Sequence, residues 1–228
     1  DILDMGGKFV IPGTCDIHVH ASQASFQGIG QNIENGQWNT WFDRYAFPDE
    51  SRFNDIAYAE QAYTRFAKSL LATPTTRLCA YATTSREATE ILMKVLAKYG
   101  FAGYVGKVNM DRNSSPGLLE TTQETITQTR LWLEETKNGV GAIYPILTPR
   151  YFPSCTESCL QQLGQLAEEY HVPVQSHLSE GLDEIDWVHE LAPDLDYYAQ
   201  AYDRAGLLGP HTQAVMAHCV FSSPEEVE

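Results

Sequence analysis

Two histidines near the start of the chain, His18 and His20, are separated by one residue in the segment PGTCDIHVH (12–20). Side chains alternate between the two faces of a β-strand, so both imidazoles and Asp16 are expected on the same face. Imidazole nitrogen is a good zinc ligand at ~2.0–2.1 Å. The spacing therefore predicts a metal site at a strand end, with two hydrogen-bonded structural histidines as the alternative.

Two later histidines close their own predicted strands, His177 in VQSHLSE (174–180) and His218 in VMAHC (215–219). The carboxyl ends of the parallel strands in a β/α barrel meet at one face, where such barrels build their active sites. Four histidines from three strands would then converge, with Glu180 in the loop after His177. Each later histidine alone would more often be a hydrogen-bonded core residue. The other histidines fall in helical or loop contexts and are interpreted as structural: His171, His189 and His211.

The elements that must position these side chains are predicted from hydrophobic periodicity. Six apolar segments of strand length alternate with amphipathic helical stretches, the clearest helices at 54–71 and 85–99. The expected strands cover residues 14–20, 77–83, 103–110, 141–148, 172–178 and 213–221. Thr121 with Glu124 forms a capping-box pattern, Thr156 is a candidate helix cap, and Gly100 follows a helix end.

This alternation predicts an α/β fold. We expect an incomplete TIM-type (β/α)8 barrel, about six of eight β-α units, in residues 14–228, with residues 1–13 as the edge of an N-terminal β segment. A doubly wound open sheet fits the same alternation, so the pattern leaves barrel closure undecided. The chain begins at Asp1 and stops at Glu228, and we expect both ends to be cut edges and such a fragment to be inactive alone.

Composition excludes several classes of partner. Among the 228 residues, 30 acidic side chains oppose 15 basic ones, giving a formal net charge of −15 that repels nucleic acid. No stretch approaches the ~20 apolar residues that a membrane helix needs, so no membrane association is expected. The five cysteines form no dense disulfide framework and are interpreted as reduced thiols of a cytoplasmic protein.

Five short stretches carry a resemblance to a known family. They are HASQ (20–23), YAFP (45–48), GKVNMDRN (106–113), TPRY (148–151) and QSHLSE (175–180). With the PGxxDxHxH opening, they resemble the amidohydrolase superfamily and, within it, the guanine deaminases, over nearly the whole chain. The resemblance implies zinc-dependent hydrolysis of guanine to xanthine and ammonia, by a full-length protein that is a homodimer.

The resemblance also implies residue roles at the reacting centre. His18, His20 and His177 would hold one zinc ion per chain, together with an aspartate on an eighth strand that this sequence does not contain. Glu180 would be the proton shuttle, and His218 would orient the attacking water.

The same resemblance assigns three residues to the substrate. Gln23 and Arg150 would hydrogen-bond the guanine edge, because a guanidinium fork suits its acceptors, and Tyr151 would pack beside the purine ring. A surface salt bridge for Arg150 and plain packing for Tyr151 are the alternatives. The loop from Ala21 to Phe53, rich in aromatic residues, is interpreted as a lid over the substrate or as loop or subunit packing.

Other functions remain open at this point. Lys107 raises the possibility of a two-metal enzyme that acts on a cyclic amide through a carboxylated lysine, although its surroundings resemble the single-zinc deaminases. A different aminopurine as substrate, or a non-catalytic barrel that serves as a scaffold, also fits the fold. The unrelated zinc site of cytidine-type deaminases does not fit, because Cys155 and Cys159 are one residue too far apart for its Cys-x-x-Cys motif. Cys219 departs from the related sequences, which commonly have glycine after this histidine.

Overall fold

Parallel strands and helices alternate along the chain, as the periodicity predicts. The computed structural model describes residues 2, 4–30 and 38–227. Its strands are β1 (Thr14–His20), β2 (Thr75–Tyr81), β3 (Ala102–Gly106), β4 (Val108–Asn109), β5 (Ile143–Pro145), β6 (Thr148–Pro149), β7 (Val174–Leu178) and β8 (Ala214–His218). Its α-helices are α1 (Trp38–Trp41), α2 (Phe47–Ser51), α3 (Ile56–Leu70), α4 (Arg86–Lys98), α5 (Thr122–Thr136), α6 (Glu157–Tyr170), α7 (Leu182–Leu191), α8 (Gln200–Arg204) and α9 (Pro224–Val227). Short 3-10 helices η1 (Ala21–Phe26), η3 (Arg52–Asn54) and η4 (Phe152–Ser154) and the π-helical turn η2 (Phe42–Ala46) complete the connections.

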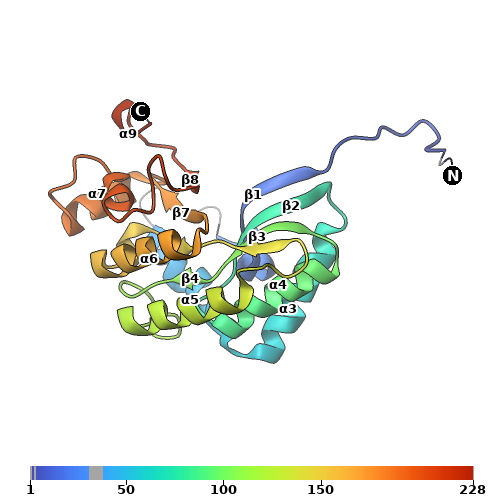
Figure 1. Ribbon diagram of the computed structural model, residues 1–228, viewed down its shortest axis with the longest axis horizontal. Helices are drawn as coiled ribbons and strands as arrows, with labels where there is room; N and C mark the ends of the chain where they lie inside the picture. The colour runs from blue at the N-terminus through green and yellow to red at the C-terminus, as the bar shows by residue number, and fades with distance from the viewer. Residues whose placement is uncertain (1, 3, 31–37, 228) are drawn as a thin grey trace.

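The strands follow one another across the sheet in chain order. Strand β1 pairs with β2, β2 with β3, β3 with β5, β4 with β6, and β7 with β8, and every pair is parallel. A parallel bridge between Leu147 and Val174 joins the middle strands to β7. A doubly wound sheet reverses its strand order at a switch point, whereas this order runs in one direction as in a barrel. The described strands therefore form an arc of an α/β barrel (Figure 1).

Two of the six predicted strands are broken into two pieces. The segment predicted at 103–110 becomes β3 and β4 with Lys107 between them, and the segment at 141–148 becomes β5 and β6. Pro145, the last residue of β5, lacks the N–H that a continuous ladder needs, which favours the second break, whereas the first segment contains no proline. The predicted strand 213–221 ends three residues early, at His218.

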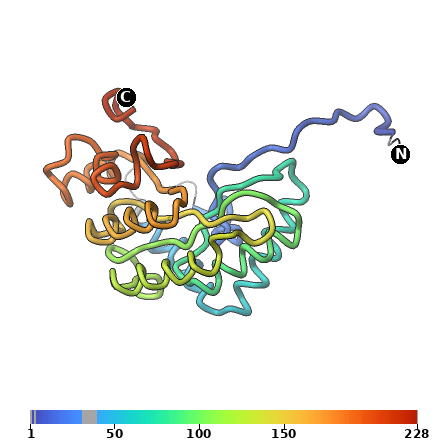
Figure 2. Tube along the Cα trace, viewed as in Figure 1, coloured from blue at the N-terminus to red at the C-terminus, as the bar shows by residue number. Residues whose placement is uncertain are grey.

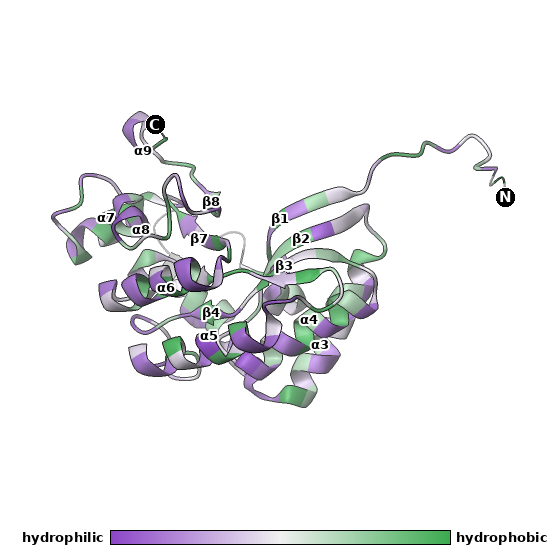
Figure 3. Ribbon diagram, in the orientation of Figure 1, coloured by the Kyte–Doolittle hydropathy of each residue, from purple (hydrophilic) through white to green (hydrophobic). Residues whose placement is uncertain are grey.

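Helices cover the outer side of the strands and bury the core. Helices α3, α4 and α5 lie along one side of β1 to β3, and the N-terminal segment projects away from β1 (Figure 1). The two chain ends lie at opposite sides of the molecule (Figure 2). Apolar side chains of α3 and α4, such as Phe66 and Leu92, are buried, while polar residues alternate with them on the outer surface (Figure 3). None of the described helices combines the length and apolar character needed to cross a bilayer.

The helix ends occur where the sequence predicts them. Ser85 and Thr156 accept hydrogen bonds from the first turns of α4 and α6, and Thr121 with Glu124 forms a complete capping box. Gly100 follows α4 with a φ of +82°, the left-handed conformation that glycine adopts freely after a helix. In contrast, residues 4–13, predicted as a β segment, contain a turn and no strand, and the domain division stays a prediction.

Three residues near the predicted site adopt left-handed backbone, which is costly for residues with a side chain. Ser179 follows β7 with a φ of +50°, while His218 and Cys219 have φ values of +74° and +52°. Strained backbone of this kind gathers at functional sites. Glycine would adopt the conformation of Cys219 without this cost, so the position is a test of backbone strain.

Replacing Cys219 with glycine is expected to raise the free energy of unfolding by about 0.5–1 kcal/mol. Glycine removes the left-handed strain from the folded state. Part of this stabilisation is lost, because glycine also increases the conformational entropy of the unfolded chain. Urea denaturation measures the difference. Cys219→Ala keeps the Cβ and serves as the control that should gain nothing; an equal gain for both variants would show that loss of the thiol, and not relief of backbone strain, is responsible.

Candidate active site

All eight residues predicted for the site line one pocket. Its volume is about 230 Å³, which suits a small molecule. The pocket opens at the carboxyl ends of β1, β7 and β8, which carry the four predicted histidines. The lining comprises His18, His20, Gln23, Trp41, Phe42, Arg150, Tyr151, His177, Glu180, Gly181, Asp183, Glu184, Trp187 and His218. The other three histidines do not line this pocket.

The four histidine rings form one cluster. The ring centroid of His18 lies 5.2 Å from that of His20, 4.8 Å from His177 and 5.0 Å from His218. Nε2 of His20 lies 2.9 Å from Nε2 of His177. One ligand atom from each of His18, His177 and His218 lies within 4.8 Å of the other two. This set contains His218 in place of the predicted ligand His20, which contacts His177 directly, and the division of roles between His20 and His218 stays a prediction.

Burial favours the neutral form of every imidazole in the cluster. Desolvation, followed by the neighbouring His218 and Arg150, lowers the pKa of His18 to about 4. The pKa values of His20 and His177 fall well below the usual value for the same leading reason, and burial also lowers the pKa of His218. Neutral imidazole is the form that coordinates a metal, so these rings are available as ligands at neutral pH.

The cluster fits a tetrahedral metal ion. Nδ1 of His177 lies 2.5 Å from the carbonyl oxygen of Arg150, so Nδ1–H donates there and the Nε2 lone pair remains for a metal. Two nitrogens on a tetrahedral zinc at ~2.0–2.1 Å would lie about 3.3 Å apart, close to the His20–His177 separation of 2.9 Å. Nδ1 of His20 is buried and has no hydrogen-bond partner among the described residues.

Glu180 lies against the histidine cluster from the loop after β7. Its Oε1 is 3.5 Å from Nε2 of His218. Burial raises the pKa of Glu180 to about 7, opposed by Arg150 and reinforced by Asp183. A carboxyl group whose pKa lies near neutrality can both accept and release a proton under ordinary conditions, as a proton shuttle must.

A second acid, Glu184, holds the loop that carries Glu180. Its carboxylate accepts hydrogen bonds from the backbone N–H of Glu180 at 2.9 Å and from the hydroxyl of Tyr198 at 2.9 Å. That hydroxyl also accepts the N–H of Phe152 at 3.1 Å. The Tyr198 hydroxyl thus links the loop after β6 to the loop after β7.

The pKa of Glu184 is raised from 4.5 to about 7, mainly by burial, while the hydrogen bonds from Tyr198 and Glu180 oppose the shift. A raised pKa means that the stability contributed by the protonated carboxyl is present below pH 4.5 and is lost as the pH rises through 7. Glutamine does not titrate, so Glu184→Gln should gain about 2–3 kcal/mol relative to the parent chain between pH 5 and pH 8. Urea denaturation at both pH values checks this, with Glu190→Gln on the exposed side of α7 as control; a pH-independent difference for Glu184→Gln would contradict it.

The polar wall of the pocket, formed by Arg150 and Gln23, is held by a buried ion pair. Nη1 and Nη2 of Arg150 lie 2.6 and 3.2 Å from the two carboxylate oxygens of Glu50, and both side chains are almost fully buried. Gln23 donates from Nε2 to Oε1 of Glu50 at 2.8 Å. Burial opposes the charge of Arg150, but Glu50 outweighs it and the pKa of Arg150 is raised. Arg150 therefore forms a salt bridge, as the alternative interpretation held, but a buried one at the pocket and not on the surface.

Aromatic rings form the rest of the pocket wall. The ring of Tyr151 lies 6.0 Å from that of Phe42 and 6.3 Å from that of Trp187, and Tyr151 is buried. Trp41 packs against Phe26 and donates from Nε1 to the carbonyl of residue 29. The predicted lid segment thus supplies pocket wall through Trp41 and Phe42, while its residues 31–37 and the side chain of Trp38 lie outside the described residues.

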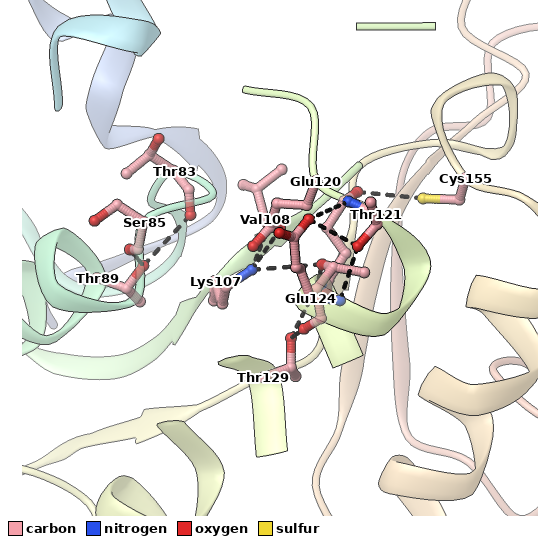
Figure 4. A network of polar contacts seen from close by, with 12 residues as sticks. Thr83, Ser85, Thr89, Lys107, Val108, Glu120, Thr121, Glu124, Thr129 and Cys155 are labelled. Carbon is pink, nitrogen blue, oxygen red and sulfur yellow. Dashed lines mark hydrogen bonds and ion pairs between the residues drawn. The ribbon is translucent and has the colours of Figure 1, made fainter. Parts of the chain in front are cut away.

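Lys107 does not take part in the histidine cluster. It is fully buried, and its Nζ lies 2.8 Å from Oε2 of Glu120 and 3.5 Å from Oγ1 of Thr125 (Figure 4). Asn109 donates to Thr125 and Thr129 in the same network. This amine is committed to an ion pair away from the pocket lining, so it is poorly placed to bridge two metals there.

Several residues at the pocket escaped prediction from the sequence. Glu184 and Trp187 line it, while Glu50 and Tyr81 contact the lining residues Arg150 and His20. Tyr81 stacks on His20 with ring centroids 4.5 Å apart and belongs to β2, the strand paired with β1. Glu184 lies four residues after Glu180 at the start of a helix, a spacing that could have drawn attention to it. In the sequence, Glu50 comes after the YAFP stretch and another acidic residue. Only its contact with Arg150 in the structure distinguishes it from a surface residue.

The chain is similar in sequence to a known family and to several known proteins. Residues 9–228 match the Amidohydrolase family. The chain is 40% identical over 228 residues to guanine deaminase of Dictyostelium discoideum and 38% identical over 222 residues to that of Homo sapiens. These alignments cover 100% and 96% of this chain but 50% and 48% of the two relatives. The chain thus spans about half the length of the curated relatives it matches.

Solved structures give the same result. A crystal structure of guanine deaminase from C. acetobutylicum with bound guanine in its active site superposes with a TM-score of 0.91 at 41% identity, covering 95% of this chain and 51% of that one. Guanine deaminase from E. coli superposes with a TM-score of 0.84 at 31% identity, covering 95% of this chain and 47% of that one. Together with the match over residues 9–228 and the arc of parallel strands that ends in clustered histidines, these likenesses show that the chain belongs to the amidohydrolase family.

Proposed function

We propose that this chain carries much of the active site of a zinc-dependent guanine deaminase, which hydrolyses guanine to xanthine and ammonia. The observation that carries the proposal is the meeting of four histidines and Glu180 in one small pocket with a polar wall and aromatic sides. Similarity to proteins named guanine deaminase, over the whole of this chain, supports the choice of substrate.

In this proposal His18, His20 and His177 hold one zinc ion, and His218 faces the attacking water. A bound zinc ion would supply a water that is nucleophilic at neutral pH. Glu180 accepts one proton of that water and delivers it to a ring nitrogen, and it then carries the second proton, from the added hydroxyl group, to the departing amine. Water adds to the carbon that carries the amino group, the C–N bond breaks, and ammonia leaves.

The pocket walls bind and orient the purine. Arg150 and Gln23 provide hydrogen-bonding groups at one edge, and Tyr151 with Phe42 and Trp187 packs against the ring faces and keeps water away. An enclosed site strengthens the electrostatic interactions within it. The cytoplasmic location and homodimer expected from the sequence belong to the same proposal; the five free cysteines are consistent with a reducing compartment.

The test is an ammonia-release assay on the complete gene product, supplied with zinc, across guanine, adenine, cytosine and S-adenosylhomocysteine. We expect guanine alone to be deaminated. Metal analysis of the same sample should give about one zinc per chain. Turnover of a different substrate with no response to guanine would refute the proposal.

A second candidate is a two-metal hydrolase of cyclic amides, which depends on Lys107. The buried contact of its Nζ with Glu120 argues against that role. Two metal ions per chain would favour this candidate, and the loss of one of them in Lys107→Ala would identify the lysine as the bridge. A scaffold without activity is the remaining alternative, and it predicts no turnover of any substrate.

A further inference from the structure

Glu50 is a buried carboxylate that joins the two polar residues of the pocket wall. It belongs to α2 and is 1% exposed, yet it contacts Arg150, which directly follows β6, and Gln23 from η1. A buried charge is costly unless it is paired and hydrogen-bonded. Glu50 meets that requirement through three bonds that all lead to groups lining the pocket.

The chemistry of a carboxylate fixes which way round the amide of Gln23 lies. An ionised carboxylate only accepts hydrogen bonds, so the Gln23 group 2.8 Å from Oε1 of Glu50 must be its NH₂. The other end of that amide, Oε1, is consequently left as an acceptor. A neutral partner at position 50 could both donate and accept and would impose no such orientation.

The carboxylate of Glu50 also occupies some of the N–H donors of Arg150. Two of its five N–H groups are directed at Glu50, and the guanidinium carbon lies 5.3 Å from the ring centroids of both Phe42 and Phe47. These contacts hold the guanidinium in one orientation, with its remaining N–H groups available to a ligand. The wall thus has an acceptor on Gln23 and donors on Arg150.

We propose that Glu50 is a positioning residue that sets this hydrogen-bond polarity and thereby makes the pocket select a lactam edge, an N–H beside a carbonyl oxygen. This inference rests on the proposed function, since guanine offers such an edge at N1–H and O6. The analogue 2,6-diaminopurine carries the same 2-amino group but reverses the edge, with an acceptor at N1 and a donor at the 6-amino group. A site built for one polarity leaves buried groups without partners when it meets the other.

The experiment compares the two purines on the complete gene product and its Glu50→Gln variant. The parent should favour guanine over 2,6-diaminopurine in kcat/KM by roughly 10³-fold or more. Glu50→Gln frees the Gln23 amide to turn, so this ratio should fall by roughly tenfold or more. Asp49→Asn is the matched control, because its carboxylate is the neighbour in α2 but contacts Arg52 and Ser25 instead; its ratio should equal that of the parent.

The ratio of dissociation constants for the two purines, measured by calorimetry, tests the inference independently of turnover. A parent that does not deaminate guanine refutes the proposed function, whereas an unchanged binding ratio in a folded Glu50→Gln variant overturns the role of Glu50. Should Glu50→Gln fail to fold, Gln23→Leu keeps the ion pair of Glu50 with Arg150 and removes the whole Gln23 amide, including its acceptor. An unchanged preference for guanine in that variant equally overturns the inference.

Discussion

In the proposed guanine deaminase, Glu180→Gln should lower kcat for guanine by roughly 10²–10⁴-fold and change KM little, because glutamine keeps the shape of the side chain but cannot accept a proton from water. The carboxylate of Glu180 lies 3.5 Å from His218 and has its pKa raised to about 7, chiefly by burial. The position of this carboxylate and its raised pKa both suit proton transfer. Steady-state ammonia release over a range of guanine concentrations separates the two constants.

Asp186→Asn provides the matched control for Glu180. It removes one negative charge from the same stretch of chain, on the exposed side of α7, without touching the pocket lining. Its kcat should stay close to that of the parent. If Glu180→Gln retained the parental kcat, another group would have to carry the proton, and Glu184, the other pocket acid with a raised pKa, would be the first to examine.

His177→Ala should empty the proposed zinc site. His177 is buried at the centre of the cluster, with Nδ1 held by the carbonyl of Arg150 and Nε2 next to that of His20. Loss of a residue that only orients a ligand already costs 10–100-fold in metal affinity, so loss of a ligand should cost at least about that much. We expect zinc content to fall from about one ion per chain towards zero, and guanine deamination to fall with it.

Metal analysis after dialysis, together with zinc titration of the stripped protein, measures this effect. His211→Ala is the control, because His211 lies outside the pocket and should leave zinc content unchanged. Circular dichroism establishes that both variants fold. A folded His177→Ala variant that keeps a full complement of zinc would remove His177 from the ligand set and favour another combination of the clustered histidines.

The elements of the fold were largely predictable because they depend on local rules. Strand β1 begins and ends at the predicted residues, since alternation of side chains along Thr14–His20 is a local property. Ser85, Thr121 and Thr156 cap their helices because a side-chain oxygen satisfies backbone groups only two or three residues away. The breaks within the third and fourth predicted strands were missed, because pairing with neighbouring strands decides where a ladder continues.

The sequence by itself determined which residues could coordinate a metal or move a proton, because His18, His20, His177 and Glu180 reveal themselves by residue type and by their place at strand ends. Only the tertiary structure decided the partners of the polar wall. Glu50 and Arg150 are 100 residues apart, and nothing local separates a buried carboxylate from a solvated one. Burial arises when distant strands and helices close around a group, and it is burial that turns an ordinary ion pair into a fixed arrangement of donors and acceptors.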